Sequence, residues 1–164
     1  ERRLLTGGIS GGRFWDMQSG TYLGKLKVWT QVYALAFAPD GNSLVTCNIA
    51  KNEAQFWELP SGRPQAVLKG HVGGMIEVTF SPDGRTLATG AYDGRIKLWN
   101  LAIGQEVATI PYSGIMTALR FSPEGRTLAA TFWMSPGYRV QLFRAPSFEE
   151  IAEKEKDASR ALQP

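Results

Sequence analysis

The residues that carry most protein chemistry are scarce in this chain of 164 residues, which holds one histidine, His71, and one cysteine, Cys47. The histidine is followed at short range by Thr89 and Asp93. An imidazole, a hydroxyl and a carboxylate can together form a proton relay that activates a nucleophile. A single histidine and a single cysteine provide no cluster of ligands at metal-binding spacing. The sequence therefore leaves one candidate for catalysis, and it predicts neither a metal nor a cofactor.

A glycine-rich segment, TGGISGG at residues 6–12, resembles a phosphate-binding loop in composition only. A loop that binds phosphate needs a following Lys-Ser/Thr pair and the start of a helix, and neither pattern follows here. The segment aligns instead with TGAYDGR at residues 89–95, which has the composition of a turn between two strands. We therefore interpret the segment as a turn.

Two aromatic markers recur along the chain with nearly the same period. Phenylalanine stands at positions 37, 80 and 121, and Trp or Phe stands at positions 15, 57, 99 and 143. The first marker repeats at intervals of 43 and 41 residues, and the second at intervals of 42, 42 and 44. Two independent markers with one period indicate an internal repeat of about 42 residues.

Each repeat has the pattern of a small antiparallel sheet. Apolar runs such as VYALAFAPDG (32–41) and MIEVTFSPDG (75–84) end in a Pro-Asp-Gly turn. A second run, a second turn, a third run ending in the aromatic marker and a fourth run follow. A four-stranded sheet of this size cannot bury both of its faces alone, so consecutive sheets must stack on one another. Such sheets stacked around an axis form a β-propeller.

The third repeat is similar to the WD40 repeats that build one class of β-propeller. The matching elements are Gly-His at 70–71, FSPDG at 80–84, LATGAYDG at 87–94 and IKLW at 96–99. Asn100 stands where the family usually has Asp, and the second and fourth repeats lack the Gly-His pair. The resemblance covers about residues 4–145.

The resemblance implies an all-β chain that forms a β-propeller arc of about three and a half four-stranded antiparallel WD40-type blades, plus a short C-terminal helix. The blades are predicted at residues 1–29 (partial), 30–72, 73–113 and 114–145 (partial), and the tail at residues 146–164. Ser147 and Glu150 have the spacing of a capping box at the start of that helix. Propellers of this class usually have about seven blades, so we expect the C-terminal part of a longer bacterial protein.

The resemblance also gives His71 a structural role. In well-formed WD40 repeats a His, a hydroxyl residue, an Asp and a Trp form one hydrogen-bonded set, and the matching residues here are His71, Thr89, Asp93 and Trp99. The donors and acceptors of these side chains are compatible with such a set. The proton relay remains the alternative, but the repeat accounts for all four residues without a substrate.

The positions at which a partner would bind follow from the same resemblance. WD40 propellers contact ligands at their narrow face, early in the first strand of a blade and just before the turn Asp. The matching positions are Gln31, Tyr33, Gly74, Ile76, Tyr92, Ile115 and Thr117. The tyrosines and isoleucines among them would supply the aromatic and apolar surface typical of interface hot spots. The alternative is that these side chains pack between blades.

Charge and hydropathy give little support for nucleic-acid or membrane partners. The formal net charge is +3, and the basic residues are scattered. On the opposite rim, Arg63, Arg85 and Arg126 stand in turns beside Pro, Asp or Glu residues, so their field is largely cancelled. No run approaches the ~18 apolar residues of a membrane helix. The single cysteine permits a reducing compartment, and we predict a cytoplasmic protein.

These patterns predict a non-enzymatic WD40 scaffold that binds a protein or peptide across the narrow face. The alternative is a regulatory or sensor module of a bacterial multidomain enzyme, such as a serine/threonine kinase, whose catalytic part lies outside this chain. A propeller hydrolase is least favoured, because Asp40, Asp83 and Glu124 fall in the family turns at the other rim. Exposed blade edges further predict self-association or the addition of a strand from a partner.

Overall fold

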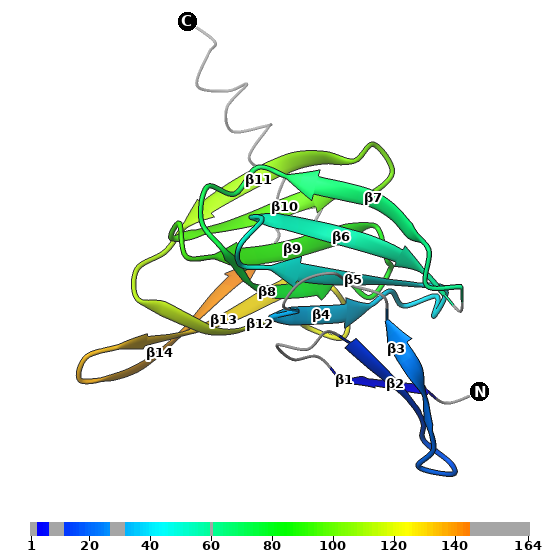
Figure 1. The fold of residues 1–164 in the computed structure, drawn as a ribbon. Coiled ribbons are helices and arrows are strands. Elements are labelled where there is room, and N and C mark those ends of the chain that lie inside the picture. Colours follow the sequence, from blue (N-terminus) through cyan, green and yellow to red (C-terminus); the bar gives the residue numbers. More distant parts are fainter. Residues whose placement is uncertain (1–2, 7–11, 27–31, 60, 145–164) are drawn as a thin grey trace, which may run out of the picture.

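The computed structural model of the chain describes residues 3–6, 12–26, 32–59 and 61–144. These residues form fourteen β-strands and no helix. The strands are arranged in four antiparallel sheets, each built from strands that are consecutive in the sequence (Figure 1). No helix within the described ranges is long and apolar enough to cross a membrane.

Each sheet is one blade, and the blades are numbered here in chain order. Blade 1 consists of β1 (Arg3–Thr6), β2 (Gly12–Asp16) and β3 (Tyr22–Leu26). Blade 2 consists of β4 (Ala34–Phe37), β5 (Ser43–Asn48), β6 (Glu53–Glu58) and β7 (Pro64–Lys69). Blade 3 consists of β8 (Met75–Phe80), β9 (Thr86–Ala91), β10 (Arg95–Asn100) and β11 (Gln105–Pro111). Blade 4 consists of β12 (Ile115–Phe121), β13 (Thr127–Met134) and β14 (Gly137–Arg144).

The predicted all-β arc of four-stranded WD40-type blades is confirmed. Blades 2 and 3 have four strands, and the described parts of blades 1 and 4 have three. Each sheet lies within one of the residue ranges predicted for a blade. The predicted C-terminal helix at 146–164, with its capping residues Ser147 and Glu150, lies outside the described residues.

Pro-Asp-Gly and Pro-Glu-Gly turns separate the first two strands in blades 2, 3 and 4. In blade 3 the amide of Gly84 donates to the carbonyl of Ser81 over 2.9 Å, which closes the turn between β8 and β9. Gly84 has a φ of +70°, a left-handed conformation that glycine adopts at little cost. The sequence pattern therefore fixes where these strands end and reverse.

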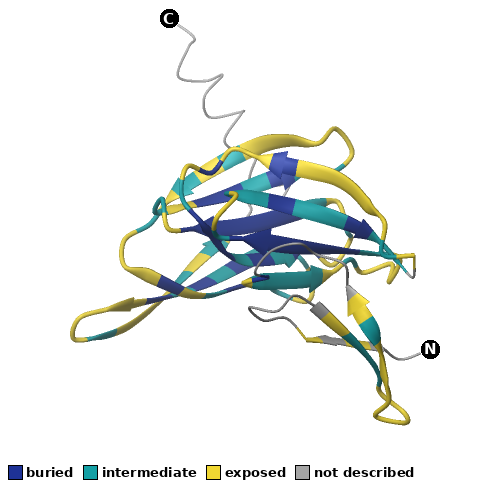
Figure 2. Cartoon of the chain, in the orientation of Figure 1, coloured by how far each residue is buried: buried dark blue, intermediate teal, exposed yellow. Residues whose placement is uncertain are grey.

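Neighbouring blades stack through their inner strands, and β8 contacts both β4 and β12 (Figure 1). The strands β5 and β9 are buried along most of their length (Figure 2). One core cluster joins blades 2 and 3 around Val45, Cys47 and Leu87, and another joins blades 3 and 4 around Ile96 and Phe132. The predicted need for each sheet to bury a face against the next is met in this way.

In blades 1 and 2 the residue before the aromatic marker packs against the following blade. Phe14 of blade 1 packs on Leu44 and Trp57 of blade 2. The ring of Phe56 in blade 2 meets the ring of Phe80 in blade 3 edge-on, with centroids 6.1 Å apart. The apolar side chains that the repeat brings back at each period are therefore the contacts that hold the blades together.

Candidate functional site

The strand register defines two opposite rims of the blades. We call the edge at which the inner strands β4, β8 and β12 begin the start rim, and the edge at which they end the end rim. In blade 3 the start rim is one register row, because Met75 pairs with Ala91, Ala91 with Arg95, and Arg95 with Pro111. Most of the predicted site residues lie at this rim.

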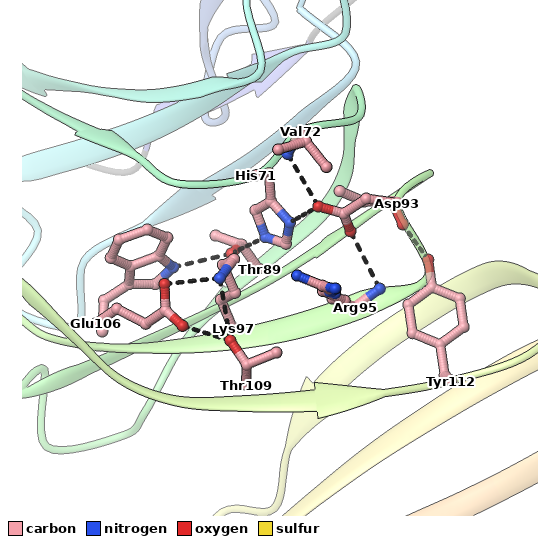
Figure 3. Close-up of polar contacts among 11 residues, drawn as sticks. His71, Val72, Thr89, Asp93, Arg95, Lys97, Glu106, Thr109 and Tyr112 are labelled. Carbon is pink, nitrogen blue, oxygen red and sulfur yellow. Dashed lines mark hydrogen bonds and ion pairs between the residues drawn. The ribbon is translucent and has the colours of Figure 1, made fainter.

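Four side chains of blade 3 form a continuous chain of hydrogen bonds (Figure 3). The Nδ1 atom of His71 lies 2.8 Å from Oδ2 of Asp93, and its Nε2 atom lies 2.8 Å from Oγ1 of Thr89. The indole Nε1 of Trp99 donates to the same Thr89 oxygen over 2.9 Å. The chain links the loop after β7, the strands β9 and β10, and the turn between them.

The hydrogen-bond partners determine the tautomer of the histidine. Asp93 accepts from Nδ1–H of His71, so Nε2 carries no proton and accepts from the hydroxyl of Thr89. Burial lowers the pKa of His71, although the hydrogen bond and charge of Asp93 oppose that shift. The imidazole is therefore neutral at pH 7.

Asp93 carries the charge of the network. Burial raises the pKa of this carboxyl group. The hydrogen bond and charge of His71 and the amides of Val72 and Arg95 together lower the pKa by more than burial raises it, so it lies below its ordinary value. Those amides donate over 3.1 Å each, to Oδ2 from Val72 and to Oδ1 from Arg95. Both oxygens of the ionised carboxylate thus accept hydrogen bonds from the protein.

The geometry of the network favours a structural role over a proton relay. The side chain of His71 is 0% exposed and that of Asp93 is 4% exposed. A relay must present its nucleophile to a substrate, but the Thr89 hydroxyl is also 0% exposed and already bonds both His71 and Trp99. Within the described ranges no group of three or more His, Cys, Asp or Glu side chains could hold a metal ion.

The other blades keep only part of this arrangement. Trp57 Nε1 donates to Thr46 Oγ1 over 2.8 Å in blade 2, and Trp15 Nε1 donates to Thr6 Oγ1 over 3.0 Å in blade 1. In blade 4 a phenylalanine, Phe143, stands at the tryptophan position. The complete network is found in blade 3, where the sequence pattern is also complete.

Blade 3 holds a second polar group that the sequence analysis missed. Lys97 Nζ donates to Glu106 Oε2 over 2.7 Å and to Thr109 Oγ1 over 3.0 Å (Figure 3). The lysine is 6% exposed, so its charge is nearly buried. The hydrogen bonds from Lys97 and Thr109 and the positive charge of Lys97 lower the pKa of Glu106. The sequence of β10 does not show that the side chain of Lys97 points inward. The carboxylate that pairs with this lysine comes from the neighbouring strand β11, so the pair is not visible in either strand alone.

The predicted partner-binding residues divide into exposed and packed groups. Tyr33 and Tyr92 are each 56% exposed and Ile115 is 48% exposed, and Thr117 is also exposed, with its hydroxyl bonded to that of Thr131. Gly74 and Ile76 are buried. Gln31 lies outside the described residues.

Ile76 lies in a β-bulge between Met75 and Glu77 and packs against Met116 and Leu119 of blade 4. This side chain therefore packs between blades, as the alternative interpretation has it, and a partner at the rim would not reach it. Gly74 is packed in the same way, since a Cβ atom there would lie 2.7 Å from Cγ2 of Ile49.

A row of aromatic side chains crosses two blade junctions at the start rim, and we call it the aromatic row. Tyr33 of blade 2 lies close enough to Tyr92 of blade 3 that its side chain, together with burial, raises the pKa of Tyr92. Tyr112, in the loop after β11, stacks on Phe132 of blade 4 with ring centroids 4.8 Å apart. Its hydroxyl donates to the carbonyl of Ala91, the residue before Tyr92.

Ile115 and Trp133, which are direct partners across β12 and β13, continue the row at the same rim, on the face of blade 4 opposite to Phe132. These side chains are 48% and 45% exposed. The sequence analysis named Ile115 but missed Trp133, because it counted only positions in the inner strand and before the turn Asp. Tyr112 was noted as the residue at the histidine position of blade 4, without a role.

The end rim carries the turns that contain Asp40, Asp83 and Glu124. Asp83 Oδ1 accepts from Ser81 Oγ over 2.5 Å and from the amide of Arg85 over 3.0 Å. Asp40 accepts from the amide of Asn42 over 2.9 Å. These carboxylates cap their own turns and do not converge on a common point, which disfavours a hydrolase site there.

Comparison with known families defines the class of these blades. The family profile described as "WD domain, G-beta repeat" matches residues 20–57 and 62–100. These two segments are therefore similar to WD40 repeats, and the four antiparallel sheets have the architecture of WD40-type β-propeller blades.

Several relatives share about half of this chain. "Protein FIZZY-RELATED 3" of Arabidopsis thaliana is 34% identical over 90 residues, which are 54% of this chain and 19% of the relative. The "B-type cell cycle switch protein ccs52B" of Medicago truncatula is 36% identical over 90 residues, 54% of this chain and 18% of the relative. "Anaphase-promoting complex subunit cdh1" of Dictyostelium discoideum is 34% identical over 90 residues, 54% of this chain and 12% of the relative. The aligned part thus spans a fifth or less of each relative, and these three organisms give no support to the predicted bacterial source.

Proposed function

We propose that this chain is a non-enzymatic scaffold that binds a protein or peptide partner through the start rim. The observation that carries the proposal is the aromatic row, whose members Tyr33, Tyr92 and Trp133 leave about half of their surface exposed. Aromatic side chains on rigid elements are the usual anchors of protein interfaces. The row spans three blades, which is long enough for an extended peptide.

The site supports binding better than catalysis. The ionisable groups of blade 3 are committed to one another, with His71 bonded to Asp93 and Lys97 bonded to Glu106. No described group at the rim has the pairing of nucleophile and exposed base that a hydrolase would require. The relatives also favour a protein partner, since one of them is named as a subunit of the anaphase-promoting complex.

A selection from a displayed library of random peptides tests the proposal. Peptides that bind the chain are expected to lose at least about tenfold in affinity for Tyr92→Ala, because hot-spot aromatics contribute about 2 kcal/mol or more. Arg63→Ala, on the end rim, is the matched control and should leave the affinity unchanged. Binders that tolerate Tyr33→Ala and Tyr92→Ala but lose affinity in Arg63→Ala would show that the start rim is not the binding surface.

A further inference from the structure

We infer that the partner segment at the start rim is an acidic peptide with an apolar anchor, and that Arg95 and Arg139 bind its carboxylates. The inference rests on the proposed function and names the chemistry of its partner. It depends on where the two arginines lie relative to the aromatic row, and on the fact that the described acids around them are buried or already paired.

Arg95 lies beside the junction of blades 2 and 3. It closes the turn that begins at Tyr92, and it pairs across the strands with Ala91. Directly paired residues project from the same face of a sheet, and Ala91 belongs to the core shared with blade 2. The exposed Arg95 side chain therefore lies on the side of blade 3 where Tyr33 and Tyr92 meet.

Arg139 holds the corresponding place at the junction of blades 3 and 4. It pairs with Phe132 across β13 and β14, so its exposed side chain shares a face with the ring on which Tyr112 stacks. Each junction that the aromatic row crosses therefore has one arginine beside it. A peptide lying along the row would meet both guanidinium groups in turn.

The described acids near the row form no ion pair with these arginines. The carboxylate of Asp93 already accepts from His71 and from two backbone amides. Glu53 at the rim of blade 2 lies between Lys51 and Lys69, at 3.7 and 3.6 Å. Over the described part of the chain, neither Arg95 nor Arg139 takes part in an ion pair.

The end rim shows the opposite arrangement. There the hydrogen bonds from Ser81 and from the amide of Arg85 lower the pKa of Asp83, and the charge of Arg85 lowers it further. The charge of Arg126 likewise lowers the pKa of Glu124. Asp83 and Glu124, beside these end-rim arginines, are exposed, whereas Asp93, which stands in the same place beside Arg95, has a side chain that is only 4% exposed. Arginine recognises carboxylates through paired N–H donors, so the start rim is the complement of an acidic segment.

A peptide fits this surface better than a nucleic acid. Proteins that bind DNA commonly make about 6–10 phosphate contacts with Lys and Arg. Among the described residues the start rim offers two arginines outside any ion pair and a pair of lysines that share Glu53. The apolar side chains Ile115 and Trp133 call for an apolar anchor in the ligand, and a short acidic peptide can provide both groups.

The test uses four fluorescein-labelled nine-residue peptides of one design. The first has a central Phe flanked on each side by two acidic residues, the second has Asn and Gln in place of the acids, the third has Lys, and the fourth keeps the acids but has Ser at the centre. Anisotropy titrations in about 50 mM and about 300 mM salt give the affinities, since salt screens exposed charge pairs.

We expect the acidic peptide with Phe to bind about four- to twenty-five-fold more tightly than the neutral one in low salt, because two exposed ion pairs contribute about two- to fivefold each. Arg95→Gln and Arg139→Gln should each remove their share of this preference and leave the affinity for the neutral peptide unchanged. Arg63→Gln on the end rim is the control and should change neither value.

Different failures separate this inference from the proposed function. Equal binding of the neutral or Lys peptide would overturn the acidic partner. An acidic preference that survives in the Arg95→Gln/Arg139→Gln double variant would overturn the assignment of its carboxylates to these arginines. Either result leaves the rim as a binding site. Displacement of the acidic peptide by an equal concentration of oligodeoxythymidylate would also overturn the acidic partner in favour of nucleic acid. Failure of all four peptides, together with a selection that yields no rim-dependent binder, would overturn both.

Discussion

Replacing Asp93 with alanine removes the acceptor that hydrogen-bonds the buried His71 and fixes its tautomer. The variant leaves the Nδ1–H group of a side chain that is 0% exposed without its partner at 2.8 Å. An unsatisfied buried donor costs about 1–3 kcal/mol, and the lost bond to the amide of Val72 adds about 1 kcal/mol. The free energy of unfolding should therefore fall by about 2–4 kcal/mol.

Urea unfolding followed by tryptophan fluorescence measures this difference, because the free energy depends linearly on denaturant. The matched control is Asp40→Ala, which removes an aspartate from a Pro-Asp-Gly turn of blade 2. Asp40 is exposed and accepts from the amide of Asn42 at 2.9 Å, so the control should cost less than about 0.5 kcal/mol. If the two variants unfolded at the same urea concentration, the hydrogen bonds of Asp93 would not be stabilising the blade, and the reasoning would be refuted.

Three further predictions concern pH, packing and thiol chemistry. Burial, opposed by Asp93, lowers the pKa of His71 in the folded chain, so the unfolded chain binds more protons; stability should fall as the pH drops through about 6.5, and the fall should be smaller in His71→Gln, as urea midpoints will show. Gly74→Ala places a methyl group 2.7 Å from Cγ2 and 2.8 Å from the carbonyl oxygen of Ile49 and should cost about 1–3 kcal/mol in urea unfolding, whereas Gly137→Ala, with nothing within 4 Å, should cost almost none. Cys47 is 0% exposed, and burial raises its pKa, so a disulfide reagent should label it only in denaturing urea; rapid stoichiometric labelling of the native chain would contradict its burial.

The strands and turns of this fold could be predicted because the same sequence pattern recurs in each repeat. Alternating apolar runs between Pro-Asp-Gly turns fix strands and reversals locally, and the aromatic markers fix the period. The polar network of blade 3 was predictable only through the resemblance to WD40 repeats. His71 and Asp93 are 22 residues apart, and no local pattern says that two loops at that separation meet.

The errors and omissions lie at the junctions between blades, where distant residues decide the outcome. Counting back from the phenylalanine marker places Ile76 and Thr117 at equivalent positions, and both fall in β-bulges. Ile76 is nevertheless covered by blade 4, whereas Thr117 of blade 4 is exposed. The contact of Tyr112 with Phe132 was missed for the same reason, since it joins a loop of one blade to a strand of the next.

The polar network and the aromatic row are structurally coupled, because the turn between β9 and β10 contributes residues to both. Asp93 is held by His71 from one side and by the amides of Val72 and Arg95 from the other. Its neighbours in the turn are Tyr92, which faces Tyr33, and Arg95, which we assign to the partner's carboxylates. A binding surface that is fixed before the partner arrives loses less conformational entropy on association. We therefore expect the buried network to fix the turn that presents Tyr92 and Arg95, without itself touching the ligand.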